Sequence, residues 1–155
     1  KALKMAIKKK TSHVLVLPDD MIYDENWVSN VRNIDIDGYL ALYLPKGLGE
    51  RYSMKRGINK INGGWANSWG GCYLMKTETA QKVVESKFYN DHLNGKLDGK
   101  GLLNYEFNKR IDHCIPEVIN RLGLEQAYLS PSQCTHKGYN STIGHTHTIH
   151  EDAYK

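Results

Sequence analysis

Apolar and polar positions follow two different patterns along the first part of the chain. Over residues 1–11, Ala2, Leu3, Ala6 and Ile7 recur at helical spacing among lysines, which predicts an amphipathic helix. Residues 13–17 form a short continuous apolar run that is rich in valine. Such a run predicts a strand buried on both faces, as in a parallel sheet.

The same patterns predict the helices and strands of the rest of the chain. Further strands are predicted at residues 38–44, 69–75 and 127–129. Helices are predicted at residues 25–33, at 78–86 with Thr77 as the cap, at 102–113, and from Pro116 to Leu122, where Gly123 ends the last one. Residues 45–66, residues 90–101 and the polar tail from residue 132 are expected to be loops. This order predicts a single α/β domain over residues 1–155, with a mixed sheet flanked by helices.

Composition and charge exclude several classes of protein. The 155 residues are 40% hydrophobic and 25% charged, as in ordinary globular domains. The net charge is +4, and five lysines fall within the first ten residues, which favours a solvated helix face over a dedicated nucleic-acid surface. No apolar run approaches the roughly 20 residues of a membrane span, and no signal peptide is recognisable.

The three cysteines are odd in number and widely spaced, which predicts no disulfide framework. We therefore expect a cytoplasmic protein, encoded by a bacterium or a phage. Because the sequence begins without methionine, a piece of a longer chain also fits.

Asp19 and Asp20 are the first candidate site, because they follow Pro18 at the carboxyl end of the first predicted strand. Ligands of α/β sheets bind at such ends. Two adjacent carboxylates repel each other, and a divalent cation such as Mg²⁺ or Mn²⁺ relieves that repulsion. The alternative is an ordinary Pro-Asp-Asp turn.

Two other segments carry candidate chemistry. The stretch WANSWGG (residues 65–71) offers Trp65 and Trp69 for stacking on a sugar ring, and its glycines allow a ligand close to the backbone. Core tryptophans beside a tight turn are the alternative. Glu106 lies near a predicted helix start, where it is either a general base or a carboxylate stabilised by the helix dipole.

The polar tail raises a separate possibility, a zinc site. Alternating histidines share one face of a strand, and a nearby thiol would complete a ligand set. The residues concerned are Cys134, His136, His145, His147 and His150. Their spacing is that of no zinc finger, and a polar tail often carries histidines without a function.

Taken together and in this order, four segments resemble nucleotide-sugar glycosyltransferases of the GT-A fold, family 2-like. HVLVLPDDMIYDENWV (13–28) is similar to the strand of that family that ends in an acidic signature, and WGGCYLMKTETAQKVV (69–84) to a later strand and helix. LLNYEFNKRI (102–111) resembles its acceptor-side helix, and YLSPSQCTHKGYNST (128–142) its closing segment.

The resemblance implies a role for individual residues. Asp20 and Asp19, with His136 as a further ligand, would hold Mn²⁺ or Mg²⁺ on the diphosphate of a nucleoside-diphosphate sugar. The residues implied to line the donor and acceptor are Trp65, Trp69, Gly70, Gly71 and Ser141. The acceptor hydroxyl, of a glycan or of DNA, would face the helix start at residues 104–106.

Two departures from the family pattern leave alternatives open. The family places its catalytic acidic pair where this chain has Leu103 and Asn104, and an amide is no base, so Glu106 or Asp98 would have to substitute. Relatives also carry a longer stretch before the first strand, so the chain resembles the C-terminal portion of such a domain. The alternatives are a non-catalytic module that binds carbohydrate or nucleic acid, and a phage-type DNA-base glycosyltransferase.

Overall fold

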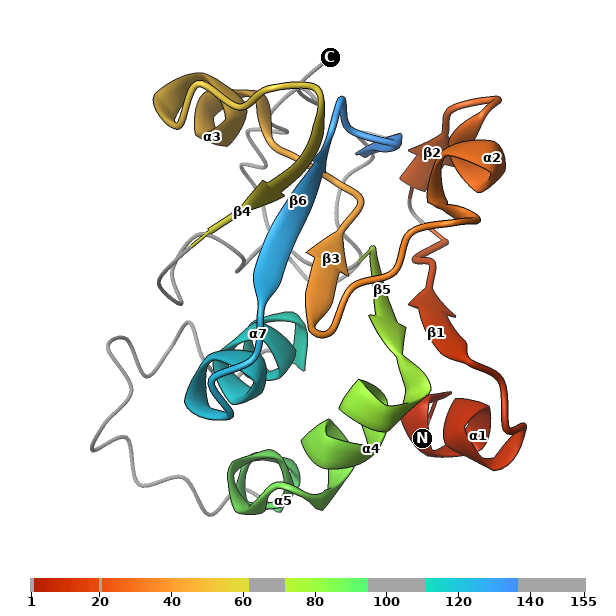
Figure 1. Cartoon of the computed structure of the whole chain (residues 1–155). Coiled ribbons are helices and arrows are strands. Elements are labelled where there is room, and N and C mark those ends of the chain that lie inside the picture. The colour runs from red at the N-terminus through yellow and green to blue at the C-terminus, as the bar shows by residue number, and fades with distance from the viewer. Residues whose placement is uncertain (1, 20, 62–71, 95–110, 137–155) are drawn as a thin grey trace.

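The computed structural model describes residues 2–19, 21–61, 72–94 and 111–136 (Figure 1). The helices are α1 (Ala2–Lys8), α2 (Trp27–Val31), α3 (Lys46–Arg51), α4 (Thr77–Glu85), α5 (Lys87–Leu93) and α7 (Ile111–Arg121). The strands are β1 (His13–Val16), β2 (Met21–Tyr23), β3 (Tyr39–Ala41), β4 (Gly57–Lys60), β5 (Tyr73–Lys76), β6 (Gln126–Ser130) and β7 (Cys134–His136). Among the described helices none has the length and apolar character needed to cross a membrane.

Five strands form the main sheet in the order β1-β5-β3-β6-β4, and β2 pairs with β7 in a separate two-stranded ribbon. Within the main sheet β3 and β6 run parallel, whereas the β1–β5, β5–β3 and β6–β4 pairs are antiparallel. The predicted α/β class and mixed sheet are therefore confirmed.

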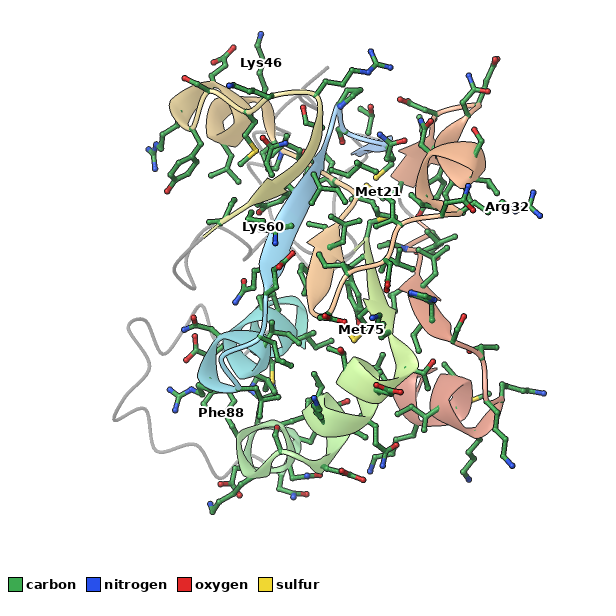
Figure 2. The ribbon with its side chains drawn as sticks, viewed as in Figure 1. Met21, Arg32, Lys46, Lys60, Met75 and Phe88 are labelled. Carbon is green, nitrogen blue, oxygen red and sulfur yellow. The ribbon has the colours of Figure 1, made fainter. Side chains whose placement is uncertain are left out.

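The pleat of the central strands sends alternate side chains to two separate cores. One face packs against α1, α4, α5 and α7, which Figure 1 shows in the lower half of the view. The other face packs against β2, α2 and β7. Met75 and Met21, both labelled in Figure 2, belong to the first and the second core respectively. The first core takes Tyr39, Ala41, Tyr73, Met75 and Tyr128 from the sheet, and the second takes Leu40, Leu74, Ala127 and Leu129, together with Leu42 just beyond β3.

Strand β1 corrects one prediction, since it is not buried on both faces. It lies at an edge of the described sheet, antiparallel to β5. Val14 is buried, but Leu15 is 36% exposed, and Leu17 just beyond the strand is 40% exposed. A continuous apolar run has no period that distinguishes a central strand from an edge strand. The sequence alone therefore predicted a central strand where the structure has an edge strand. The fully buried strands are β3 and β6.

Three segments predicted as loops contain regular structure. Helix α3 and strand β4 lie within residues 45–66, α5 reaches into residues 90–101, and β7 lies in the polar tail. Gly47 and Gly49 weaken the helical signal of α3. The two strands form through pairing with β6 and β2, which a local pattern cannot indicate.

Two predicted helix features are wrong and one is confirmed. Thr77 is not a side-chain cap: Lys76 occupies the cap position, no side chain bonds there, and the Thr77 hydroxyl is buried without a partner. Pro116 does not open a new helix, because α7 runs through it as one helix. Gly123 does end α7, with φ of 66°. The N–H groups of Gly123 and Leu124 donate to the carbonyls of Asn120 and Ile119, a Schellman arrangement.

Gly38 allows β3 to approach the residue before β6. The Tyr39 N–H donates to the Glu125 carbonyl at 2.9 Å. A Cβ atom on Gly38 would lie 1.8 Å from that same oxygen, so no other residue fits without moving the backbone. The parallel β3–β6 pair at the centre of the sheet depends on this contact.

Candidate functional site

One end of the main sheet gathers most of the segments that the sequence marks as functional. Val16 and Ala41, the last residues of β1 and β3, both pair with Tyr73, the first residue of β5. Ser130, the last residue of β6, pairs with Gly57, the first residue of β4. We call this the loop end of the sheet; it lies in the upper half of Figure 1.

Three of the four segments that resemble glycosyltransferases join the sheet at the loop end. Asp19 follows β1 there, and the segment of residues 131–136 follows β6. Residues 69–71 directly precede Cys72, whose carbonyl accepts from the Leu42 N–H at 3.0 Å at this end. The expectation that Asp19 follows the carboxyl end of a strand is confirmed, although that strand is an edge strand.

The β2–β7 ribbon brings the first and last of these segments together. Met21, the residue that follows Asp20 in the chain, pairs with His136. Ile22 pairs with Thr135 and Tyr23 with Cys134, so the antiparallel register is continuous. Directly opposite residues of such a pair have Cα atoms about 4.5–5.5 Å apart. The pairing therefore places the backbone of His136 beside Met21, two residues after Asp19, although the two are more than a hundred positions apart in sequence.

A side-chain hydrogen bond closes the turn between β1 and β2. The Tyr23 hydroxyl donates to the Pro18 carbonyl at 2.8 Å. The Tyr23 ring packs on Trp27 of α2, with ring centroids 5.4 Å apart. Asp19 lies within the closed turn and is exposed.

Gln133 connects the ribbon to the main sheet. Its N–H donates to the Leu42 carbonyl at 2.8 Å, and its own carbonyl accepts from the Asp24 N–H at 3.0 Å. Its side-chain oxygen accepts from Asn30 of α2 at 2.8 Å. Because Gln133 is only 2% exposed, its backbone bonds are shielded from water, whereas the bond from the exposed Asn30 is only partly buried. They tie β3, the end of β2 and α2 to one buried residue.

Ser132 provides a second buried anchor in the same segment. Its side chain is fully buried, and its oxygen accepts from the Leu44 N–H at 3.1 Å. The same hydroxyl donates to the Cys134 carbonyl at 2.7 Å. Ser132 and Gln133 together fix where β7, and with it His136, leaves the sheet.

The opposite end of the sheet carries an ion cluster of a different kind. Lys76 lies 2.8 Å from Asp35 and 2.5 Å from Asp37. Hydrogen bonds to Asp35 and then Asp37 hold the pKa of Lys76 above its usual range, and the bond from Lys76 lowers the pKa of Asp37. Since both carboxylates bind Lys76, the last residue of β5, this cluster is a structural tie between the 34–38 segment and β5.

Most residues of the predicted site lie outside the described residues. These are Asp20, Trp65, Trp69, Gly70, Gly71, Asp98, Asn104, Glu106 and Ser141, together with His145, His147 and His150 of the zinc alternative. Of the candidate ligands, Asp19 is described, and the backbone of His136 is placed in β7. Within the described ranges no group of three His, Cys, Asp or Glu residues is arranged to hold a metal. Cys134, the thiol of the zinc alternative, is fully buried in the second core.

Tyr23, Ser132 and Gln133 were not predicted from the sequence. Their roles depend on bonds to Pro18, Leu44 and Leu42, and only the folded chain reveals these partners. The alternation in MIYDENW gives at most a weak signal, because it places Tyr23 on the same side as Met21.

Comparison with known proteins does not assign the chain to a family. No family model, no curated protein and no solved structure matches it. A function must therefore be argued from the sequence and from the geometry of the loop end.

Proposed function

We propose that this chain is the metal- and acceptor-binding portion of a nucleotide-sugar glycosyltransferase of the GT-A fold. The observation that supports it best is the pairing of Met21 with His136. It places the backbone of His136, the late histidine that the resemblance marks as a ligand, beside Met21, the residue that follows Asp20 in the chain.

The residues near the ribbon suit a hard divalent cation. Asp19 is exposed at the loop end, and carboxylate oxygens are the ligands that Mg²⁺ and Mn²⁺ prefer. Imidazole also suits Mn²⁺, which favours a mixed set of Asp19, Asp20 and His136. Such an ion would neutralise the charge that develops on a departing nucleoside diphosphate.

The chain itself would supply positioning. In this proposal the aspartates hold the diphosphate through the ion, and the WGG segment before β5 lines the donor sugar. Glu106 or Asp98 would take the proton of the acceptor hydroxyl if the anomeric centre is inverted, since Asn104 cannot. A retaining reaction would need no such base.

Ligand-induced stabilisation tests the proposal. A ligand present at 100 times its Kd stabilises the native state by about 2.7 kcal/mol. For a chain of this size that raises the melting temperature by roughly 5–10 °C. We expect this shift with Mn²⁺ and one of the common nucleoside diphosphates, and its loss in Asp20→Ala. Asp35→Ala, which removes an exposed carboxylate at the opposite end of the sheet, is the matched control and should keep the shift.

The absence of a shift with every nucleoside diphosphate would reject the proposal. The second candidate, a carbohydrate-binding module without turnover, is favoured by Asn104 at the place of the expected base. Sugar binding without hydrolysis or transfer of any donor would support that module instead.

The lysine-rich helix α1 gives little support to the alternative of a DNA acceptor. Lys4, Lys8, Lys9 and Lys10 are exposed, as the solvated-face interpretation predicts. However, α1 contacts α4 and the beginning of β1, so it lies away from the loop end (Figure 1). DNA binding that weakens steeply with added salt would support this alternative.

A further inference from the structure

Strand β1 leaves one edge of the main sheet open within the described residues. Figure 1 shows β1 at the right-hand side of this sheet, beside β5. We propose that the open edge binds a second copy of the chain, through an antiparallel pair of two β1 strands centred on Leu15. The proposal does not depend on the proposed function, because it uses only β1 and the residues on either side of it.

The register of β1 shows which backbone groups face the open edge. The Ser12 carbonyl accepts from the Thr77 N–H at 2.9 Å, in line with the β1–β5 pairing. Because bonded positions alternate along an antiparallel strand, Val14 and Val16 direct their N–H and C=O groups toward β5. Leu15 therefore directs both of its backbone groups away from β5, where no other strand of the described sheet lies.

The two edges of the sheet differ in how they are protected. Natural edge strands carry charged side chains, bulges or prolines that discourage pairing with another chain. At the edge formed by β4, Gly57 has a φ of 108° and Lys60, labelled in Figure 2, is charged. Strand β1 has instead three consecutive apolar residues after His13, and Leu15 among them is 36% exposed. The β1 edge is therefore the one suited to pairing.

A two-fold axis at Leu15 gives a pairing in which the apolar positions match. Each Leu15 lies opposite the other, and each N–H donates to the other carbonyl. The two valines of β1 lie opposite each other on the side of the first core. Leu17, which is 40% exposed, lies opposite His13. The His13 carbonyl already accepts from the Thr11 hydroxyl at 2.9 Å, and a carbonyl oxygen can accept a second bond, here from the Leu17 N–H.

Charge complementarity favours a second copy of this chain as the occupant. Three exposed lysines, Lys8, Lys9 and Lys10, precede β1, and the exposed Asp19 follows it. An antiparallel pair places the start of one β1 beside the end of the other, so the lysines of each copy approach Asp19 of the other. A parallel pair would bring like charges together. Opposite charges at both ends therefore favour the antiparallel direction that the two-fold axis requires.

Disulfide cross-linking tests this register. In the proposed pair the two Leu15 Cα atoms are about 5.5 Å apart, within the range of about 4.4–6.8 Å that a disulfide spans. Leu15→Cys should therefore form a covalent dimer with oxidised glutathione, detected on a non-reducing gel. Leu17→Cys is the matched control, because Leu17 is similarly exposed but is displaced by about 13 Å along the strands from its own copy. The three native cysteines are buried, so they should not cross-link.

Sedimentation velocity measures the association of the unmodified chain. Since β1 has only four residues, the interface is small, and we expect a weak dimer that forms between about 10 µM and 1 mM. Leu15→Lys places two like charges directly opposite each other and should raise the dimer Kd at least about 10-fold. Ile58→Lys makes the same kind of change on β4, where Ile58 is 43% exposed, and should leave the Kd unchanged.

A wild-type chain that stays monomeric over this range would overturn the proposal. That is also the result expected if another segment of the same chain, or a different protein, covers β1. A dimer in which Leu17→Cys cross-links as readily as Leu15→Cys would overturn it too, because another register or surface would then join the chains. Circular dichroism checks that each variant folds. If Leu15→Lys does not fold, the two cysteine variants still decide between these outcomes.

Discussion

Replacing Ser132 with alanine is the most stringent test of how the ribbon is anchored. The hydroxyl is fully buried, accepts from the Leu44 N–H at 3.1 Å and donates to the Cys134 carbonyl at 2.7 Å. Alanine leaves the Leu44 N–H buried without this acceptor, which costs about 1–3 kcal/mol, and the second lost bond adds about 1 kcal/mol. Ser132→Ala should therefore destabilise the fold by about 2–4 kcal/mol.

Urea unfolding followed by tryptophan fluorescence measures this loss. The midpoint should fall while the slope of free energy against urea stays constant, because the surface exposed on unfolding is unchanged. Ser29→Ala, which loses a bond exposed to water, should change stability by less than about 0.5 kcal/mol. If Ser132→Ala is as stable as Ser29→Ala, the hydroxyl does not anchor β7 and the reasoning about this segment is wrong.

Three further predictions concern the rest of the fold. The hydrogen bond from Lys76 lowers the pKa of the Asp37 carboxyl. The stability that this bond contributes is therefore present above the pKa of Asp37 in the unfolded chain and is lost as pH falls through its pKa in the folded chain. In Lys76→Met, carboxyl NMR titration should show the Asp37 midpoint move upward, and an unmoved midpoint would contradict the assignment. Burial raises the pKa of Cys114 to about 12, so iodoacetamide at pH 8 should modify it only after unfolding, and fast labelling of the native chain would refute its burial. Gly38→Ala places a Cβ atom 1.8 Å from the Glu125 carbonyl oxygen. It should lower the free energy of unfolding in urea by at least about 3 kcal/mol. An unchanged free energy of unfolding would contradict the close approach of Gly38 to Glu125.

The sequence predicted the elements whose signals are local. The apolar run at residues 38–44 and the helical period of residues 78–86 correspond to β3 and α4, and Gly123 ends α7 as its chemistry predicts. The run at residues 13–17 was correctly predicted as a strand but wrongly placed at the centre of the sheet. Burial of a short apolar run is decided by its neighbours in space, and these come from β5, some sixty residues later.

The sequence marks candidate ligands, but it does not show which segments pair beside them. Asp19 and His136 carry side chains of a recognisable chemistry, so the sequence marks them. The pairing of Met21 with His136 depends on β7, a strand in a segment polar enough to be predicted as a tail. That strand exists because β2 pairs with it and because Ser132 and Gln133 are buried beside β3. Each of these causes is a long-range contact.

The stoichiometry of Mn²⁺ binding tests the central claim most directly. Calorimetric titration of the chain with Mn²⁺ in the presence of a nucleoside diphosphate should give one ion per chain, and Asp20→Ala should abolish that binding while Asp35→Ala keeps it. Absence of binding to wild type, or equal binding to Asp20→Ala, would contradict the assignment of a metal-diphosphate site to the loop end.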